Sequence, residues 1–76
     1  MNMNNADKIR NFLEKETQLV IETDGTDLIK LGVLDSFSMI KLINFIETGL
    51  GVKIDMEELS QENFNSINTI VSMIRK

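Results

Sequence analysis

The sequence predicts an all-α fold, a small four-helix bundle of three main helices and one short helix with a long first loop. Three segments, residues 6–18, 36–48 and 66–74, carry apolar residues at helical spacing. The chain has 76 residues and no proline to interrupt them, which is room for one domain only. We therefore expect a single domain over residues 1–76, with residues 1–5 frayed.

The first main helix is predicted from Ile9, Phe12 and Leu13, which follow each other at i, i+3 and i+4 behind an N-cap at Asn5. The last is predicted from a Ser66 cap and the apolar residues Ile67, Ile70, Val71 and Ile74, with Arg75 and Lys76 at its negative end.

The second main helix has the widest apolar face, made of Met39, Ile40, Leu42, Ile43, Ile46 and Leu50. We expect Gly49 and Gly51 to end it, because both tolerate positive φ. After it, Asp55–Glu58 has the pattern of a capped turn and Ser60–Phe64 that of a single short helical turn.

Between the first two helices, residues 19–34 lose the helical period and predict an ordered loop. We expect the core to hold this loop through Leu28, Ile29, Leu31 and Leu34. The segment Thr23–Asp27 is superficially similar to a calcium loop, but it lacks the ligand spacing and the closing glutamate of an EF-hand. A solvated turn is the expectation there.

The composition excludes several kinds of chemistry. Without cysteine or histidine, the chain has no disulfide, no thiolate or imidazole metal site and no Ser-His or Cys-His nucleophile. We expect a protein that is not an enzyme and holds no metal. The net charge of −4 repels nucleic acid and favours partners that present lysine and arginine. No apolar run approaches a membrane span and Met1–Asn5 has no leader pattern, so we expect a cytoplasmic location without membrane insertion.

Asp35 and Ser36 stand where the long loop meets the second main helix. An acidic residue and a serine are common helix starts, so capping alone would explain them. The alternative is that Ser36 presents its hydroxyl at the positive end of the helix, where a phosphate is favoured. The chain supplies no base to activate that hydroxyl, so another protein would have to attach the group.

The chain resembles the acyl carrier protein family. The residues that carry the resemblance are Leu31-Gly32-Val33-Leu34-Asp35-Ser36-Phe37-Ser38, then Gly49-Leu50-Gly51-Val52-Lys53-Ile54, and the segment Leu59–Ile67. The last segment is similar to the third helix of stand-alone carriers and the entry to their fourth. The resemblance covers nearly the whole chain from Ile9 to Ile74.

This resemblance implies a function for the Asp-Ser pair. Ser36 would accept 4′-phosphopantetheine from coenzyme A through a phosphopantetheinyl transferase, and Asp35 would be the adjacent acid that helps to coordinate magnesium in the transferase complex. The flexible arm would hold an acyl group as a thioester, for a ligase, synthase or transferase of lipid or secondary metabolism. A carrier of this kind is expected to be a monomer that meets its partners transiently.

Some residues indicate which branch of the family is nearest. Val33 and Leu34 both stand between Gly32 and Asp35, where fatty-acid-synthase carriers usually have one residue, and Phe37 replaces a leucine or isoleucine. In these respects the chain is similar to specialised stand-alone carriers and D-alanyl carrier proteins. An aminoacyl or D-alanyl carrier loaded by an adenylating ligase is therefore an alternative. A small helical interaction module without a prosthetic group is another.

Two surfaces are candidates for partner recognition. The first comprises the predicted exposed positions of the second main helix, Phe37, Ser38, Lys41, Asn44 and Glu47, with Phe37 as the apolar anchor. One lysine and one glutamate nearly cancel there, so we expect weak electrostatic steering. The second is the acidic run Asp55, Glu57, Glu58 and Glu62, which is either a docking patch or a solvated face.

A possible acyl pocket is the last candidate site. Seven apolar residues are first of all expected core, namely Ile40, Ile43, Ile46, Ile54, Phe64, Ile67 and Ile70. In carriers that sequester their cargo, such residues part to admit the acyl chain. The sequence does not separate that role from packing.

Overall fold

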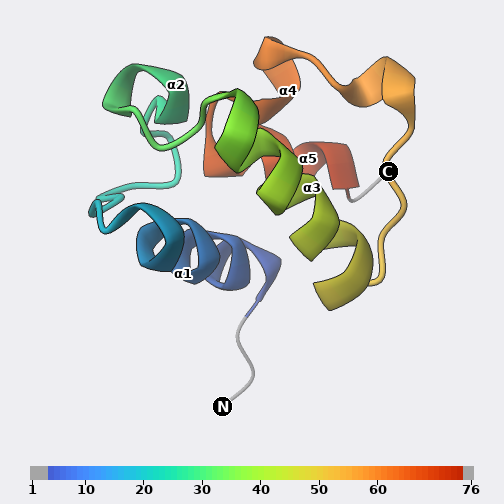
Figure 1. Ribbon diagram of the computed structural model, residues 1–76, viewed down its shortest axis with the longest axis horizontal. Coiled ribbons are helices and arrows are strands. Elements are labelled where there is room, and N and C mark those ends of the chain that lie inside the picture. Colours follow the sequence, from blue (N-terminus) through green and yellow to red (C-terminus); the bar gives the residue numbers. More distant parts are fainter. Residues whose placement is uncertain (1–3, 75–76) are drawn as a thin grey trace.

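The computed structural model describes residues 4–74, which form helices and loops without a strand (Figure 1). The elements are α1 Asn5–Thr17, α2 Leu28–Leu31, α3 Ser36–Gly49, the 3-10 helix η1 Met56–Glu58, α4 Gln61–Phe64 and α5 Ile67–Ile74. The all-α prediction is confirmed, with α1, α3 and α5 as the three main helices and α4 as the short one. No helix in this described part of the chain combines the length and apolar character needed to cross a bilayer.

The core lies where α1 contacts both α3 and α5, and α4 closes it against α5 (Figure 1). Its buried apolar residues are Ile9, Leu13, Ile21, Leu28, Val33, Leu34, Leu42, Ile46, Ile54, Phe64, Ile67, Ile70 and Met73. Every main helix contributes to this one cluster. Removing these side chains from water is the main source of stability in a domain of this size.

Helix α1 begins one residue earlier than predicted. The Asn4 side chain accepts a hydrogen bond from the Asp7 amide at 2.8 Å, so Asn4 is the N-cap and Asn5 is already helical. The predicted cap at Asn5 is therefore wrong by one position, and Asn4 and Asn5 belong to the ordered helix start instead of a frayed end. Residues 1–3 lie outside the described residues.

Phe45, near the end of α3, contacts both α1 and the position of Gly49. Its ring stacks on Phe12 of α1 with 4.4 Å between the ring centroids and 15° between the planes. A Cβ on Gly49 would lie 3.1 Å from the Phe45 ring, so a larger residue there would require the ring to shift by a few tenths of an ångström. Gly49 is still helical and only Gly51 has positive φ, at 71°. The expectation that Gly49 ends the helix through positive φ is therefore wrong.

Ile40 is not part of the core. It is 68% exposed, whereas Leu42 and Ile46 of the same helix are fully buried. At 100° per residue, Ile40 points about 200° away from Leu42 around the helix axis. The predicted apolar face was wider than the face that α3 turns inward.

The first loop contains a helical turn, α2, that the sequence did not reveal. Asp27 caps it, since its carboxylate accepts hydrogen bonds from the Ile29 and Lys30 amides at 3.0 Å each. The turn buries Leu28, and Leu34 is buried after it, as predicted. Leu31 is 39% exposed instead.

Val33 takes the inward place that was expected for Leu31. It is fully buried, because Gly32 with φ of 88° ends α2 and redirects the chain before Val33. The left-handed conformation at Gly32 is one that few other residues adopt easily.

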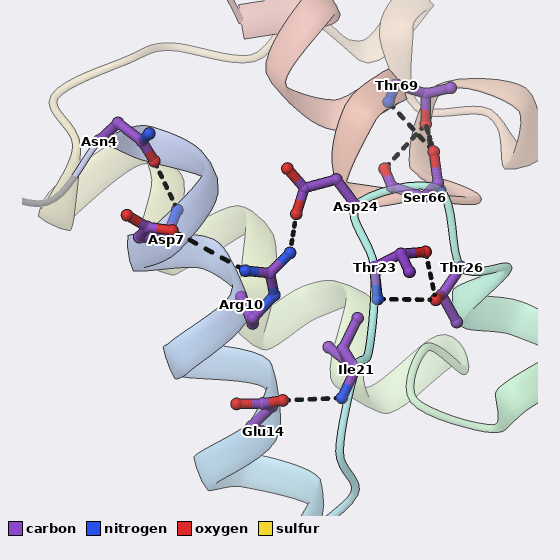
Figure 2. Close-up of polar contacts among 10 residues, drawn as sticks. All are labelled: Asn4, Asp7, Arg10, Glu14, Ile21, Thr23, Asp24, Thr26, Ser66 and Thr69. Atoms are coloured by element: carbon purple, nitrogen blue, oxygen red, sulfur yellow. Dashed lines mark hydrogen bonds and ion pairs between the residues drawn. The ribbon is translucent and has the colours of Figure 1, made fainter.

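The first loop is tied to the junction between α4 and α5. The Leu28 amide donates to the Asn65 carbonyl at 2.7 Å, and the Asn68 amide donates to the Asp24 carbonyl at 2.9 Å. The Asp24 side chain forms an ion pair with Arg10 of α1 (Figure 2). The segment Thr23–Asp27 therefore links the loop to α1 and α5 through Asp24, whereas the sequence predicted only a solvated turn.

The start of α5 agrees with the prediction. Ser66 and Thr69 bond reciprocally: the Thr69 amide donates to Ser66 Oγ at 3.2 Å, and the Ser66 amide donates to Thr69 Oγ1 at 3.1 Å (Figure 2). Arg75 and Lys76, predicted at the other end of this helix, lie outside the described residues. The turns at Asp55–Glu58 and Ser60–Phe64 are confirmed as η1 and α4.

Two glutamates hold the chain where it leaves α1 and α3. Glu14 Oε2 accepts a hydrogen bond from the Ile21 amide at 2.7 Å (Figure 2), and Glu47 Oε2 accepts one from the Ile54 amide at 3.3 Å. In both places the isoleucine side chain is buried. Each carboxylate thus fixes the residue that re-enters the core after a long helix.

Two matched substitutions on α3 test this orientation. We expect Ile46→Ala to lower the free energy of unfolding by about 2–5 kcal/mol, because it deletes a fully buried side chain. We expect Ile40→Ala to change it by less than about 0.5 kcal/mol, because that side chain faces solvent. Urea denaturation followed by circular dichroism measures both values, and equal losses would contradict the exposure of Ile40.

Candidate functional site

Ser36 is the first residue of α3, and its side chain is exposed. Asp35 before it is the N-cap, in extended conformation, with its Oδ1 accepting a hydrogen bond from the Ser38 amide at 2.8 Å. The Asp35 carbonyl accepts the Met39 amide at 2.9 Å and so closes the first helical turn. The cap that the sequence predicts is present, and the Ser36 hydroxyl is left at the surface.

The residues before Asp35 set the place where α3 begins. The amides of Val33 and Leu34 both donate to the Leu28 carbonyl, at 2.9 and 3.1 Å. Because both of these side chains are buried while Asp35 and Ser36 are exposed, the chain emerges from the core just before the serine. Val33 and Leu34, the two residues between Gly32 and Asp35, therefore anchor the site.

The charge of the site is set by a carboxylate at a helix N-terminus. The hydrogen bond from the Ser38 amide is the main cause that holds the pKa of Asp35 below its ordinary value. The same helix end, with its exposed amides and positive dipole, favours a phosphate on Ser36. A phosphodiester at this hydroxyl would meet a favourable field and would displace no core residue.

The structure places most predicted recognition residues at the surface of α3. Phe37 is 67% exposed, and Lys41, Asn44 and Glu47 are exposed as well, whereas Ser38 is half-buried. Ile40, which the sequence analysis assigned to the apolar face and the possible pocket, is exposed as well, three residues after Phe37 on the solvent side of the helix. Its spacing from Phe37 was the signal that could have found it.

The predicted pocket residues separate into two groups. Ile46, Ile54, Phe64, Ile67 and Ile70 are buried together in the core cluster, and Ile43 packs against them partly buried. Exposed Ile40 is not a member, so its assignment to a pocket is wrong. The remaining six residues are core in this conformation.

The acidic run has a mixed character. Asp55, Glu57 and Glu62 are exposed, while half-buried Glu58 accepts a hydrogen bond from the Asp55 amide at 3.4 Å. Met56 within the run is 85% exposed. The run is therefore a surface of carboxylates around an apolar side chain, with Glu58 partly used to shape η1.

The family model for phosphopantetheine attachment sites matches residues 7–74, nearly the whole chain. The chain belongs to this family. The carrier is 33% identical over 67 residues to the D-alanyl carrier protein of Streptococcus equi subsp. zooepidemicus (strain MGCS10565), covering 88% of this chain and 80% of that relative. Membership implies covalently attached 4′-phosphopantetheine, and it identifies a carrier instead of an enzyme.

Solved structures share the carrier's fold. A chain in the crystal structure of Bradyrhizobium japonicum glycine:[carrier protein] ligase, complexed with its cognate carrier protein and an analogue of glycyl adenylate, matches with a TM-score of 0.75 and 26% identity. The match covers 92% of this chain and 90% of that one. A chain in the crystal structure of an FAD-dependent dehydrogenase matches with a TM-score of 0.72 and 34% identity, covering 84% and 98%.

The lowered pKa of Asp35 makes the carrier's stability depend on pH. Because the folded-state pKa lies below the ordinary value of about 3.9, the unfolded chain binds more protons as the pH falls between the two. The stabilisation by this cap is therefore complete above the ordinary value and is lost as the pH falls through the folded pKa.

Asp35→Asn isolates that contribution, since asparagine keeps a cap acceptor but carries no charge. We expect wild type to melt at a higher temperature than Asp35→Asn at neutral pH, and the difference to shrink below pH about 4. Thermal melts followed by circular dichroism at a series of pH values measure it. Parallel curves over the whole range would contradict the expectation.

Proposed function

We propose that Ser36 is the attachment residue and that the loaded arm carries an aminoacyl group. The observation that supports Ser36 is its position: it is an exposed serine that opens a helix of 14 residues directly after the N-cap. Among the other serines, Ser66 is buried, Ser38 is half-buried and Ser60 caps the single turn α4, while exposed Ser72 lies inside α5. Ser36 alone among these five combines exposure with the start of a long helix.

Ser36 would contribute the hydroxyl oxygen that bonds to the pantetheine-side phosphorus of the coenzyme A pyrophosphate, while the P–O bond of the pyrophosphate breaks and adenosine 3′,5′-bisphosphate leaves. The hydroxyl proton would go to a base on the transferase, because the chain has no histidine and the lowered pKa of the neighbouring Asp35 makes its carboxylate a weak base. Asp35 would contribute its carboxylate to the magnesium ion of that complex. When bound, the arm supplies a thiol that holds the cargo as a thioester.

An aminoacyl cargo is favoured by two comparisons of different kinds. The sequence comparison finds a D-alanyl carrier protein from Streptococcus. The structure comparison finds a chain from a complex of a glycine ligase with its carrier protein. Such a cargo would be loaded by an adenylating ligase. Because this ligase consumes ATP and the transferase consumes coenzyme A, we place the carrier in the cytoplasm.

An acyl cargo for lipid or secondary metabolism is the second candidate. It is supported by the six pocket residues that do lie together in one core cluster, Ile43, Ile46, Ile54, Phe64, Ile67 and Ile70. An acyl chain would have to part these closely packed side chains at a cost in stability. A small aminoacyl group needs no such opening.

Partner enzymes would dock on the exposed face of α3 beside Ser36. Phe37 is the proposed apolar anchor and Ile40 extends it by one helical turn, with Ser38, Lys41, Asn44 and Glu47 around them. The exposed carboxylates Asp55, Glu57 and Glu62 form a second surface, for a partner that presents lysine or arginine. We expect the carrier to be a monomer and to bind each partner enzyme transiently.

Intact mass spectrometry tests the attachment residue. After incubation with coenzyme A, magnesium and a broad-specificity phosphopantetheinyl transferase, we expect the chain to gain one phosphopantetheine. Ser36→Ala should abolish the gain, and Ser38→Ala, a serine two residues away in the same helical turn, should keep it. A gain that survives in Ser36→Ala would refute the assignment.

The cargo is tested with the holo-chain and ATP. We expect a hydroxylamine-sensitive mass gain of one alanyl or glycyl group with a D-alanine ligase of a Streptococcus D-alanyl carrier protein, or with the Bradyrhizobium glycine:[carrier protein] ligase. Hydroxylamine cleaves thioesters, so sensitivity places the group on the arm. Loading by a fatty-acyl ligase alone would favour the acyl candidate instead.

A further inference from the structure

Lys41 is not a free charge on α3. Its Nζ lies 3.1 Å from Glu16 Oε1 of α1 and 4.6 Å from the centroid of the Phe37 ring. Lys41 therefore connects the last turn of α1, through Glu16, to the first turn of α3, through Phe37, beside Ser36. Helices α1 and α3 pack against each other, so this contact joins two fixed elements (Figure 1).

The contact between Lys41 and Phe37 restricts the rotation of the ring, and the ion pair between Lys41 and Glu16 restricts the movement of the lysine. Phe37 is 67% exposed, and a side chain with so little packing has little to hold its rotamer. Lys41 follows Phe37 by four positions, the spacing at which two side chains meet on a helix. A cation over the ring face is attracted to it, but a lysine on a flexible stem can also move away. Glu16 limits that movement from the neighbouring helix.

The surroundings of the ion pair leave it only partly exposed to water. The side chains of Lys41 and Glu16 are 46% and 34% exposed. They line a groove of about 240 Å³ between α1 and α3, together with Phe12, Asn44, Phe45 and Thr48. Partial shielding by these neighbours strengthens the attraction relative to a fully hydrated pair.

We propose that Glu16 is a positioning residue, which orients Phe37 through Lys41 for enzymes that act at Ser36. The inference rests on the proposed function, because Phe37 matters as an anchor only if an enzyme approaches the adjacent serine. It assigns a role in recognition to α1, a helix without a residue in the attachment motif. It also changes the role of Lys41 from a charge offered to the partner to a support for the ring.

Nuclear magnetic resonance of the apo-chain tests the orientation directly. A methylene group over the face of an aromatic ring is shielded, so we expect the Lys41 ε-methylene protons of wild type to resonate upfield of an ordinary lysine. Glu16→Gln should move them back toward the ordinary position, and Glu22→Gln, which removes the same charge from an exposed site, should not. If the Lys41 ε-methylene protons of Glu16→Gln resonate at the same upfield position as in wild type, the proposal is overturned.

Transferase kinetics test the consequence for recognition. Since exposed contacts of these two kinds each change an equilibrium about two- to five-fold, we expect Glu16→Gln to raise the KM for the apo-chain by a similar factor, with kcat unchanged. Glu22→Gln, which removes the same charge from an exposed site, should keep the wild-type KM. A fall in kcat without a change in KM would overturn the positioning role.

Two double variants separate orientation from helix packing. Glu16→Lys with Lys41→Glu restores an ion pair between α1 and α3 but leaves no cation over Phe37, so we expect the raised KM to persist. In a Phe37→Ala background, Glu16→Gln should have no further effect, because the ring it acts on is gone. A normal KM in the first variant, or an additive loss in the second, would overturn the proposal.

These results remain separable from the attachment test. If no transferase adds a mass to wild type, the proposed function fails while the nuclear magnetic resonance comparison still reports the ring orientation. If wild type is loaded and Glu16→Gln matches it in KM and in the Lys41 shift, only the inference about Glu16 fails.

Discussion

The position of Ser36 depends on two backbone hydrogen bonds that join the first loop to the junction of α4 and α5. They run from the Leu28 amide to the Asn65 carbonyl and from the Asn68 amide to the Asp24 carbonyl. Each is worth only about 0.5–1.5 kcal/mol net, and together they join two points of the loop to the junction. Besides them, the loop before α3 is held by its buried side chains, by the ion pair between Arg10 and Asp24 and by the hydrogen bond from the Ile21 amide to Glu14. The same junction begins α5, so the core and the segment that leads to Ser36 are held at the same place.

Glu14 and Glu47 hold the chain at two further places where it leaves a long helix. After α1 and again after α3, the chain must turn and bring an isoleucine back into the core, without a regular element to pair its backbone. Glu14 and Glu47 accept the amides of Ile21 and Ile54 and so satisfy one backbone donor at each return. Long loops in a small domain can then be ordered with few buried residues. Glu47 therefore stabilises the fold, beyond any contact it makes with a partner.

The main helices and the start of α3 at Asp35 and Ser36 could be predicted from the sequence because their signals are local. Periodic apolar residues mark α1, α3 and α5, and an acid followed by a serine marks a helix start. Ile40 was misplaced because the apolar residues of α3 extend around much of the helix, and only packing decides which of them face inward. Gly49 was misinterpreted because a glycine near the end of a helix can be either its last helical residue or the residue with positive φ, and here Gly51 has the positive φ. The turn α2 was missed because four residues are too few for a period.

The structure shows what the sequence does not, that both charged residues of α3 have partners within the chain. The helix has one lysine and one glutamate, and both have partners within the chain: Lys41 pairs with Glu16, and Glu47 accepts the Ile54 amide. Under the proposed function, α3 would bind mainly through exposed Phe37 and Ile40, at short range and with little dependence on salt. Attraction over distance would come from the exposed carboxylates Asp55, Glu57 and Glu62. Steering and anchoring would thus belong to different elements, so a partner could be selected by the apolar fit at α3 even where many basic partners are attracted equally.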